Sequence, residues 1–132
     1  MGIFSKTKKI VKKILIVEDD TLLAKVLSEN FLSEKFQVSV VGNGLEVEDA
    51  VKSFSPDIIL LDLIIPGIDG FAVLKQLKEN LKTKDIPVVV ISNLGSVADV
   101  KSAKVLGAEE YFIKSNTSLE KITKYVFNKL KV

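Results

Sequence analysis

Carboxylate, hydroxyl and lysine side chains stand at the ends of apolar runs that have the character of buried strands. Glu18 and Asp19 follow one run, Asp62 a second and Lys114 another, while Ser92 ends a fourth. Three carboxylates within a few ångström of one another cannot all stay ionised without a cation. Oxygen ligands beside room for water suit Mg²⁺, and a lysine with a hydroxyl can hold the oxygens of an anion. These residue types indicate phosphoryl chemistry on a carboxylate, with an acid as the nucleophile.

Five apolar runs alternate with five amphipathic segments, and these elements must bring the polar side chains together. The runs predict strands at 14–17, 37–41, 58–61, 88–91 and 111–113, and the periodic segments predict helices at 21–33, 45–54, 70–79, 97–106 and 119–130. Continuous apolar strands separated by helices are typical of a parallel sheet covered on both faces. We therefore expect an α/β fold, a flavodoxin-like doubly wound five-stranded parallel sheet in the order 2-1-3-4-5 with five helices. In that order the acids after the first and third strands converge where such sheets bind ligands.

Local signals predict helix ends and one buried helix face. Asp20 is expected to cap the first helix rather than to bind metal, and Asp69 to cap or turn the chain before Gly70. Gly107 can end the fourth helix in a left-handed conformation. The first helix has apolar residues at the spacing of a single buried face, namely Leu22, Leu23, Val26, Leu27 and Phe31.

Composition limits both the size of the protein and its chemistry. The 132 residues suit one domain, with 47% hydrophobic and 27% charged residues. Because Cys and His are absent, the sequence lacks disulfides, the usual zinc ligands and the Ser/His/Asp and Cys/His nucleophile systems. All 19 basic residues are lysine, which argues against direct DNA binding because bidentate contacts favour arginine. No apolar run is long enough for a membrane span and no signal peptide is present, so we expect a cytoplasmic protein.

Four motifs in order resemble those of the receiver domains of two-component response regulators, in particular stand-alone receivers similar to the chemotaxis regulators. The motifs are LIVEDD, IILLDLIIPGIDG, VVVISN and GAEEYFIKS. Each alone is a weak signal, but four at these spacings are specific, and the resemblance covers Lys12 to Lys131. We expect a receiver domain over residues 12–132, preceded by a flexible basic extension over residues 1–11. Because the chain ends after the last predicted helix, we also expect no output domain.

The resemblance implies a role for each strand-end residue. Asp62 would accept a phosphoryl group from the histidine of a sensor histidine kinase or a phosphotransfer protein. Mg²⁺ would be held by Glu18, Asp19, the Asp62 carboxylate and the backbone carbonyl of Ile64. Lys114 would pair with the phosphoryl oxygens.

The resemblance also implies a switch in a phosphorelay. Ser92 would hydrogen-bond the new phosphoryl group, and Tyr111 would swing inward into the space that Ser92 vacates. A protein-binding face over residues 96–131 would change as a result and contact a separate target protein. The protein would be a monomer or a phosphorylation-dependent dimer. It would be a phosphoacceptor that assists its own phosphorylation and dephosphorylation, and not an enzyme.

Four residues lie around the expected mouth of the pocket. Asn93 and Ser115 depart from the family pattern, and Ile64 and Leu94 occupy positions that the family varies to tune the lifetime of the phosphorylated form. Asn93 stands where the family has a small residue. Ser115 stands where it has proline, so we expect a trans peptide bond between Lys114 and Ser115. Ile64 and Leu94 border the pocket and are apolar, so they cannot position a hydrolytic water. These two side chains predict a slow loss of phosphate.

Three other functions stay open at this stage. The protein would be a constitutive, non-cycling interaction module if Asn93 and Ser115 prevented phosphorylation. A hydrolase with an aspartyl intermediate would require a second acid at the position that Ile64 occupies. A flavodoxin-like cofactor binder would have to place a phosphate against the acidic loop after the first strand. Mg²⁺-dependent labelling of Asp62 separates the switch from these alternatives.

Overall fold

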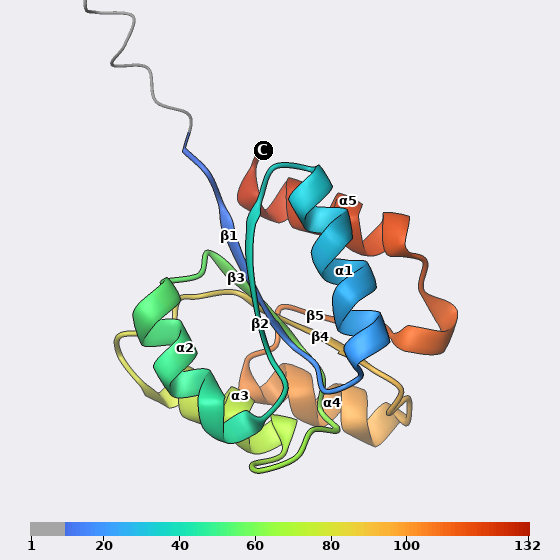
Figure 1. Ribbon diagram of the computed structural model, residues 1–132. Helices are drawn as coiled ribbons and strands as arrows, with labels where there is room; N and C mark the ends of the chain where they lie inside the picture. Colours follow the sequence, from blue (N-terminus) through green and yellow to red (C-terminus); the bar gives the residue numbers. More distant parts are fainter. Residues whose placement is uncertain (1–9) are drawn as a thin grey trace, which may run out of the picture.

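The computed structural model describes residues 10–132, in which five strands alternate with five α-helices (Figure 1). The strands are β1 (Lys13–Val17), β2 (Gln37–Val41), β3 (Ile58–Leu61), β4 (Val88–Ser92) and β5 (Glu110–Ile113). The helices are α1 (Thr21–Ser33), α2 (Val47–Phe54), α3 (Gly70–Glu79), α4 (Val97–Leu106) and α5 (Leu119–Leu130), with short 3-10 helices η2 (Gly44–Glu46) and η3 (Lys114–Asn116). Residues 1–9 of the expected basic extension lie outside the described residues, so the extension and its boundary stay predictions.

The sheet has the predicted topology. All strand pairs are parallel and the order is β2-β1-β3-β4-β5, which confirms the predicted fold. The register pairs Val17 with Leu61, the last residues of β1 and β3, so the residues that follow them leave the sheet side by side. In the β4–β5 pair Ser92 lies opposite Ile113, which brings the end of β5 next to the end of β4. The strand ends that carry polar residues therefore share one edge of the sheet.

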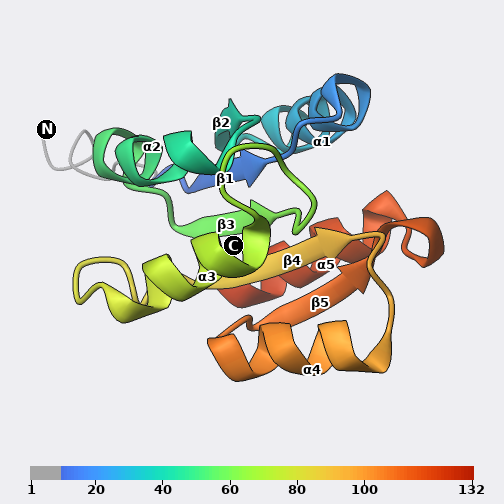
Figure 2. The same cartoon turned by 90° about the horizontal axis from the view of Figure 1, so that it is seen from below.

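Helices cover both faces of the sheet, and successive strand residues point to opposite faces. Figures 1 and 2 show α1 and α5 on one side and α2, α3 and α4 on the other. Leu15 and Ile59 pack under α2 and α3, whereas Ile16 and Leu60 pack under α1 and α5. The strands between these two layers are almost fully buried, as the continuous apolar runs predict. Within residues 10–132, none of the helices has the length and apolar character that crossing a membrane requires.

Helix ends follow the predicted signals, with one correction. The side chain of Asp20 accepts hydrogen bonds from two amides in the first turn of α1, at 3.0 and 3.2 Å. Asp69 caps α3 in the same way, and Gly107 ends α4 with a φ of 114°. The helix predicted to begin at Leu45 begins two residues later, at Val47. The reason is that Asn43 caps η2 first, because its side chain accepts from the amide of Leu45 at 2.8 Å.

The single buried face predicted for α1 is wrong in part. Leu27 and Phe31 are buried against β1 and β3, but Leu22 is 71% exposed and Val26 is 43% exposed. The apolar residues of α1 form a stripe along the helix that is wider than the surface that the sheet covers. Two apolar side chains of α1 are therefore left on the surface.

Candidate functional site

The carboxyl ends of the strands bring the predicted polar residues into one cluster. Glu18 and Asp62 are each 4% exposed, and Ser92 at the end of β4 is completely buried. Asp19, the next residue after Glu18, is exposed to solvent. One carboxylate oxygen from each of Glu18, Asp19 and Asp62 lies within 4.8 Å of the other two. The cluster therefore has two buried acids and one acid that faces water.

Lys114, which directly follows β5, contacts both buried acids. Its Nζ lies 2.6 Å from Oε1 of Glu18 and 2.7 Å from Oδ2 of Asp62. The remaining carboxylate oxygens are held by backbone amides, Oε2 of Glu18 by the amide of Asp20 at 3.0 Å and Oδ1 of Asp62 by the amide of Ile64 at 3.1 Å. Each carboxylate is thus fixed at both oxygens, which orients the acids before any ligand arrives.

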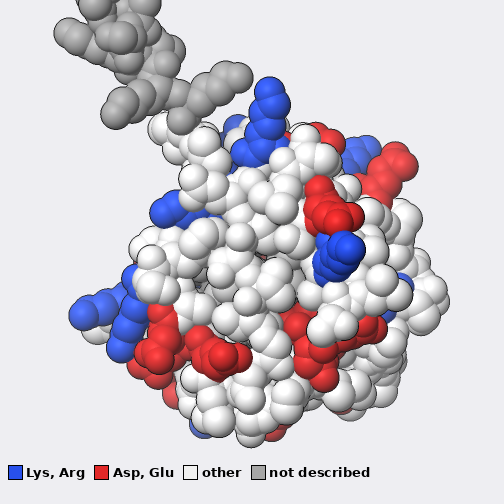
Figure 3. All heavy atoms as spheres, in the orientation of Figure 1, with Lys and Arg blue, Asp and Glu red and all other residues white. Residues whose placement is uncertain are grey.

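Burial and charge oppose each other in this cluster. Burial raises the pKa of the Glu18 carboxyl, and the nearby charge of Asp62 acts in the same direction, although Lys114 acts against both. Burial acts to lower the pKa of Lys114, but its hydrogen bonds to Asp62 and Glu18 outweigh that effect and raise it. A further positive charge beside the two buried carboxylates would therefore stabilise their ionised forms. On the surface, Figure 3 shows acidic side chains gathered beside the start of α1 and over α2.

The donor set fits a small hard cation. Carboxylate oxygens from two neighbouring strand ends and a solvent-facing acid provide few ligands and leave room for water, which is the arrangement that Mg²⁺ prefers. Ile64 follows Asp62 by two residues, and its amide contact to the Asp62 carboxylate holds this part of the loop beside the cluster. Glu18, Asp19, Asp62 and the Ile64 carbonyl stay the predicted ligands.

The second half of the site links Ser92 to Tyr111 through the loop after β4. Oγ of Ser92 accepts a hydrogen bond from the amide of Leu94 at 3.3 Å, and the hydroxyl of Tyr111 donates to the Leu94 carbonyl. Tyr111 is only 9% exposed, and burial is the main cause that raises the pKa of its hydroxyl. Tyr111, which was expected to swing inward, thus already lies inward in this structure. The movement itself stays a prediction.

The four residues predicted to surround the pocket mouth are Ile64, Asn93, Leu94 and Ser115, and they differ in exposure. Asn93 is exposed and lines a groove with Lys114 and Ser115. Ile64 is 55% exposed, whereas Leu94 packs partly against the core. The peptide bond between Lys114 and Ser115 is trans, as predicted, and the chain continues into η3.

Sequence reasoning missed two residues beside this mouth. Leu22 and Val26, the exposed apolar residues of α1, line the same groove as Asn93 and Lys114. The signal was available in the number of apolar residues on α1, which is larger than one buried stripe requires. Their position next to the pocket makes them candidates for contact with a partner protein.

Comparisons with known proteins agree with this geometry. A family model described as the response regulator receiver domain matches residues 14–127. Sporulation initiation phosphotransferase F of Bacillus subtilis is 37% identical over 103 residues, which cover 78% of this chain and 82% of that protein. The DNA-binding dual master transcriptional regulator RpaA of Synechocystis is 32% identical over 102 residues, which cover 77% of this chain but only 42% of that regulator.

Solved structures give the same result. The phosphorylated cyanobacterial phytochrome response regulator RcpA has a TM-score of 0.78 at 29% identity, and the match covers 91% of each chain. The Mn²⁺-bound form of response regulator Rcp1 has a TM-score of 0.78 at 28% identity, covering 89% of this chain and 92% of that one.

Proposed function

The chain belongs to the response regulator receiver domain family of two-component systems, and from this premise we propose that it is a Mg²⁺-dependent phosphorylation switch with Asp62 as the phosphoacceptor. One observation carries the proposal. Nζ of Lys114 lies within 2.7 Å of both buried acids, and Asp19 completes a cluster of three carboxylates. The phosphorylated state of RcpA and the Mn²⁺-bound state of Rcp1 support the same chemistry in similar chains.

The phosphoryl donor would be a phosphohistidine of a histidine kinase or of a phosphotransfer protein. An oxygen of Asp62 attacks phosphorus, the new O–P bond forms, and the P–N bond of the donor breaks. The electron pair of that bond stays on the imidazole nitrogen, which takes up a proton. Lys114 would move its Nζ from the Asp62 carboxylate to the phosphoryl oxygens and neutralise charge there.

Mg²⁺, when bound, would supply further positive charge next to the transferring phosphoryl group. Glu18 and Asp19 would hold it together with Asp62 and the carbonyl of Ile64. Because burial raises the pKa of Glu18, the protein gains from placing a cation beside this carboxylate. We propose that the protein assists its own phosphorylation and dephosphorylation in this way and has no other substrate.

Output would pass through the loop after β4 to the face formed by residues 96–131. A phosphoryl oxygen that accepts from Ser92 would pull this hydroxyl away from the amide of Leu94, and Tyr111 holds the carbonyl of the same residue. The next residues lead into α4, where Val97 is 86% exposed and Val105 is 78% exposed.

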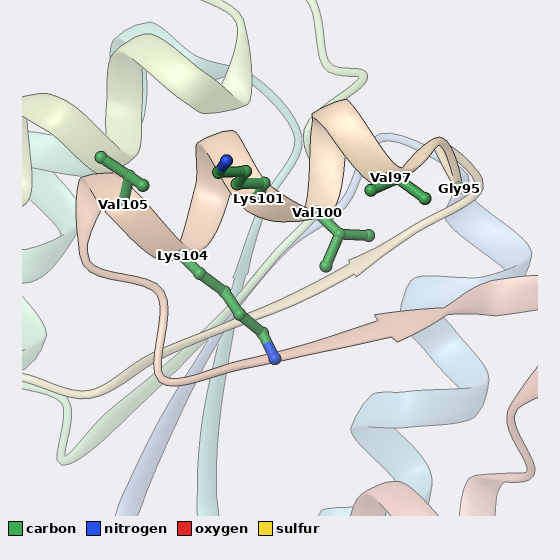
Figure 4. Close-up of a pocket in the computed structure, with 6 residues that line it drawn as sticks. All are labelled: Gly95, Val97, Val100, Lys101, Lys104 and Val105. Carbon is green, nitrogen blue, oxygen red and sulfur yellow. The ribbon is translucent and has the colours of Figure 1, made fainter.

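The surface of α4 has the properties of a protein-binding face. Figure 4 shows Val97, Val100 and Val105 along α4 with Lys101 and Lys104 beside them, and these residues line one shallow groove. Lys104 extends toward β5, where its Nζ lies 3.6 Å from the carboxylate of Glu110. Exposed apolar side chains bordered by lysines favour a target with apolar and acidic residues.

The donor protein would dock at the other side of the pocket. Leu22 and Val26 of α1 are exposed next to Asn93 and Ser115, and all four line the groove that leads to Lys114. An apolar contact at this place would bring the donor histidine to the open side of the acidic cluster. Input and output would then use different faces of one domain.

Intact mass spectrometry tests the central claim. Incubation with Mg²⁺ and acetyl phosphate should add one phosphoryl group to the wild-type protein. Asp62→Asn should abolish this gain, whereas Asp69→Asn, which changes the α3 cap on the same loop, should retain it. Equal modification of the wild type and Asp62→Asn would show that Asp62 is not the acceptor. Light scattering of both forms would distinguish a monomer from a phosphorylation-dependent dimer.

A constitutive interaction module is the second candidate, and the position of Tyr111 favours it. The tyrosine lies inward, in the position that the switch would give it only after phosphorylation. If this candidate is correct, acetyl phosphate adds no mass, and the amide chemical shifts of residues 94–106 do not change with the phosphodonor. A mass gain with shifts on α4 supports the switch.

A further inference from the structure

The loop after β3, residues 62–70, is closed tightly on itself. The amide of Gly70 donates to the carbonyl of Leu63 at 2.9 Å. A Cβ added to Gly70 would lie only 2.5 Å from the carbonyl oxygen of Asp62. Such close packing leaves little freedom between the two ends of the loop. A displacement of the outer part of this phosphoacceptor loop therefore reaches Asp62 and Ile64.

A short segment after β2 lies between this loop and the acidic loop after β1. We call Gly42, Asn43 and Gly44 the spacer. A Cβ added to Gly42 would lie 3.5 Å from the carbonyl oxygen of Glu18 and 3.6 Å from Cα of Asp19, which is van der Waals contact. Only a methyl group would fit between Gly42 and the backbone of these two predicted metal ligands. The residue before the spacer, Val41, accepts a hydrogen bond from the amide of Glu18 at 3.0 Å, which ties this end to the acidic loop.

The second end of the spacer is fitted against the phosphoacceptor loop. The amide of Gly44 donates to the carbonyl of Pro66 at 3.0 Å. A Cβ on buried Gly44 would collide with the carbonyl oxygen of Ile68 and lie 2.9 Å from its carbonyl carbon. Oδ1 of Asn43 fills the space over Gly67, whose φ is 85°. Asn43 and Gly44 therefore touch the backbone of the phosphoacceptor loop, and no space is left for an added methyl group there.

We propose that the spacer sets the separation between the acidic loop and the phosphoacceptor loop, and thereby the Mg²⁺ affinity of the site. The two loops supply different ligands, Glu18 and Asp19 from one and Asp62 from the other. The spacer is hydrogen-bonded to one loop through Gly44 and follows directly on Val41, which is hydrogen-bonded to the other. The spacer contributes no carboxylate, so its residues are positioning residues. This inference rests on the proposed function, because it concerns the predicted metal site.

Gly44→Ala tests the spacer directly. The added Cβ must move either the Ile68 carbonyl or the spacer itself, and either movement changes the distance between the two loops. We expect Mg²⁺ binding to weaken about 10- to 100-fold, the usual effect of disturbing residues that support metal ligands. The measurement is a Mg²⁺ titration of the unphosphorylated, ¹⁵N-labelled protein, followed by amide chemical shifts.

A kinetic readout separates positioning from general damage. In phosphorylation by acetyl phosphate, Gly44→Ala should need more Mg²⁺ for half-maximal rate but should approach the wild-type rate at saturating Mg²⁺. Gly107→Ala is the matched control, because its φ of 114° and the contact of its new Cβ with Lys78 at 2.8 Å strain the far end of the sheet. This control should lower the unfolding temperature without changing Mg²⁺ affinity.

Asn43→Ala is the milder variant, which decides the matter if Gly44→Ala does not fold. Loss of the side chain opens the space over Gly67 and removes the hydrogen bond to the amide of Leu45, but the backbone hydrogen bond from Gly44 to Pro66 remains. We therefore expect Mg²⁺ binding to weaken about 3- to 10-fold. A wild-type protein that does not bind Mg²⁺ would contradict the proposed function itself. If the wild type binds and the folded spacer variants bind equally well, only the role of the spacer is overturned.

Discussion

Two lysines at opposite ends of the sheet have partners of different charge, although each contacts them through its side-chain amine. Lys114 stands at the carboxyl end, and its Nζ lies 2.6 and 2.7 Å from the carboxylates of Glu18 and Asp62. Lys78 stands in the last turn of α3 near the amino end, and its Nζ donates to the backbone carbonyls of Lys84 and Ile86 at 3.0 and 2.7 Å. One amine faces charged partners and the other faces neutral ones.

The two pKa values move in opposite directions for this reason. Burial lowers the pKa of Lys78, and the more distant charges of Glu109 and Asp85 do not compensate. Burial acts on Lys114 in the same direction, but two carboxylates in direct contact reverse the result. Lys78 therefore holds the turn after α3 in place, whereas Lys114 neutralises two buried carboxylates and, in the proposed function, would transfer its contact to a phosphoryl group. Partner chemistry, more than depth, decides what a half-buried lysine can do.

The largest expected difference comes from changing each lysine to methionine. Lys114→Met leaves Glu18 and Asp62 buried without their cation, so we expect a loss of about 3 kcal/mol in Mg²⁺-free unfolding free energy. Phosphorylation by acetyl phosphate should slow about 100-fold or more. Lys78→Met keeps the aliphatic chain and loses two hydrogen bonds, so stability should fall by about 1 to 2 kcal/mol with no change in phosphorylation rate. Urea unfolding and intact-mass time courses measure the two effects.

If Lys114→Met and Lys78→Met were phosphorylated at the same rate, the two lysines would not differ in function. Added Mg²⁺ sharpens the comparison further. It should restore much of the stability of Lys114→Met, because the ion replaces the missing positive charge beside the acids. It should stabilise Lys78→Met only as much as the wild type, so the deficit of this variant should remain.

The next largest effect is expected at Glu18, whose carboxyl has a raised pKa because of burial. Folded Glu18 binds a proton more readily than unfolded Glu18, so its ionised form opposes folding at pH values above the folded pKa. Glu18→Gln should therefore raise Mg²⁺-free stability at pH 7, and this advantage should vanish as the pH falls to the ordinary value of 4.5 and below. Mg²⁺ affinity should fall about tenfold or more, because the site loses one ligand charge.

Glu109→Gln is the matched control at the other end of the sheet. Glu109 pairs on the surface with Lys129 at 3.1 Å, so its change should alter stability by less than about 1 kcal/mol and Mg²⁺ affinity not at all. Thermal unfolding between pH 4 and 8, with and without Mg²⁺, measures both variants. If Glu18→Gln is the less stable protein at pH 7, the ion pair with Lys114 outweighs burial and the interpretation is wrong.

Exposed apolar side chains at the two ends should differ in their effect on phosphate loss. Ile64 is 55% exposed beside Asp62, and Leu81 is 79% exposed after α3. Ile64→Gln would introduce a group that can orient water near the phosphoryl group, and we expect about tenfold faster dephosphorylation, below the effect of a full general base. Leu81→Gln should not change the rate. Decay of radiolabelled protein measures both, and rapid decay of the wild type would contradict the predicted slow loss.

The fold could be predicted from the sequence because its signals are local. Apolar runs such as 58–61 define the strands within about one residue, and Asp20, Asp69 and Gly107 act at helix ends through contacts with their own neighbours. The strand-end residues of the site were also predictable, because a parallel sheet collects all carboxyl ends at one edge. Position along the chain was sufficient to place Glu18, Asp62 and Lys114 together.

Features that depend on contacts between distant segments could not be predicted. The delay of α2 to Val47 and the close fit of Gly44 against Ile68 both depend on how two loops meet. The exposure of Leu22 depends on how much of α1 the sheet covers. The inward position of Tyr111 and the carbonyl partners of Lys78 likewise require three-dimensional contacts that no spacing rule contains.

The smallest predicted effect concerns two tyrosines whose hydroxyls differ in their partners. Tyr111 donates to the carbonyl of Leu94, whereas Tyr125 on α5 packs edge-on against Phe112 with ring centroids 5.6 Å apart. Tyr111→Phe should reduce stability by about 1 kcal/mol, because the part-buried carbonyl of Leu94 loses its donor, and Tyr125→Phe should change it by less. Hydrogen exchange at residues 94–96 should quicken only in Tyr111→Phe. Unchanged exchange there would mean that the hydroxyl does not restrain the loop, and the path from Ser92 to α4 would then have to run without Tyr111.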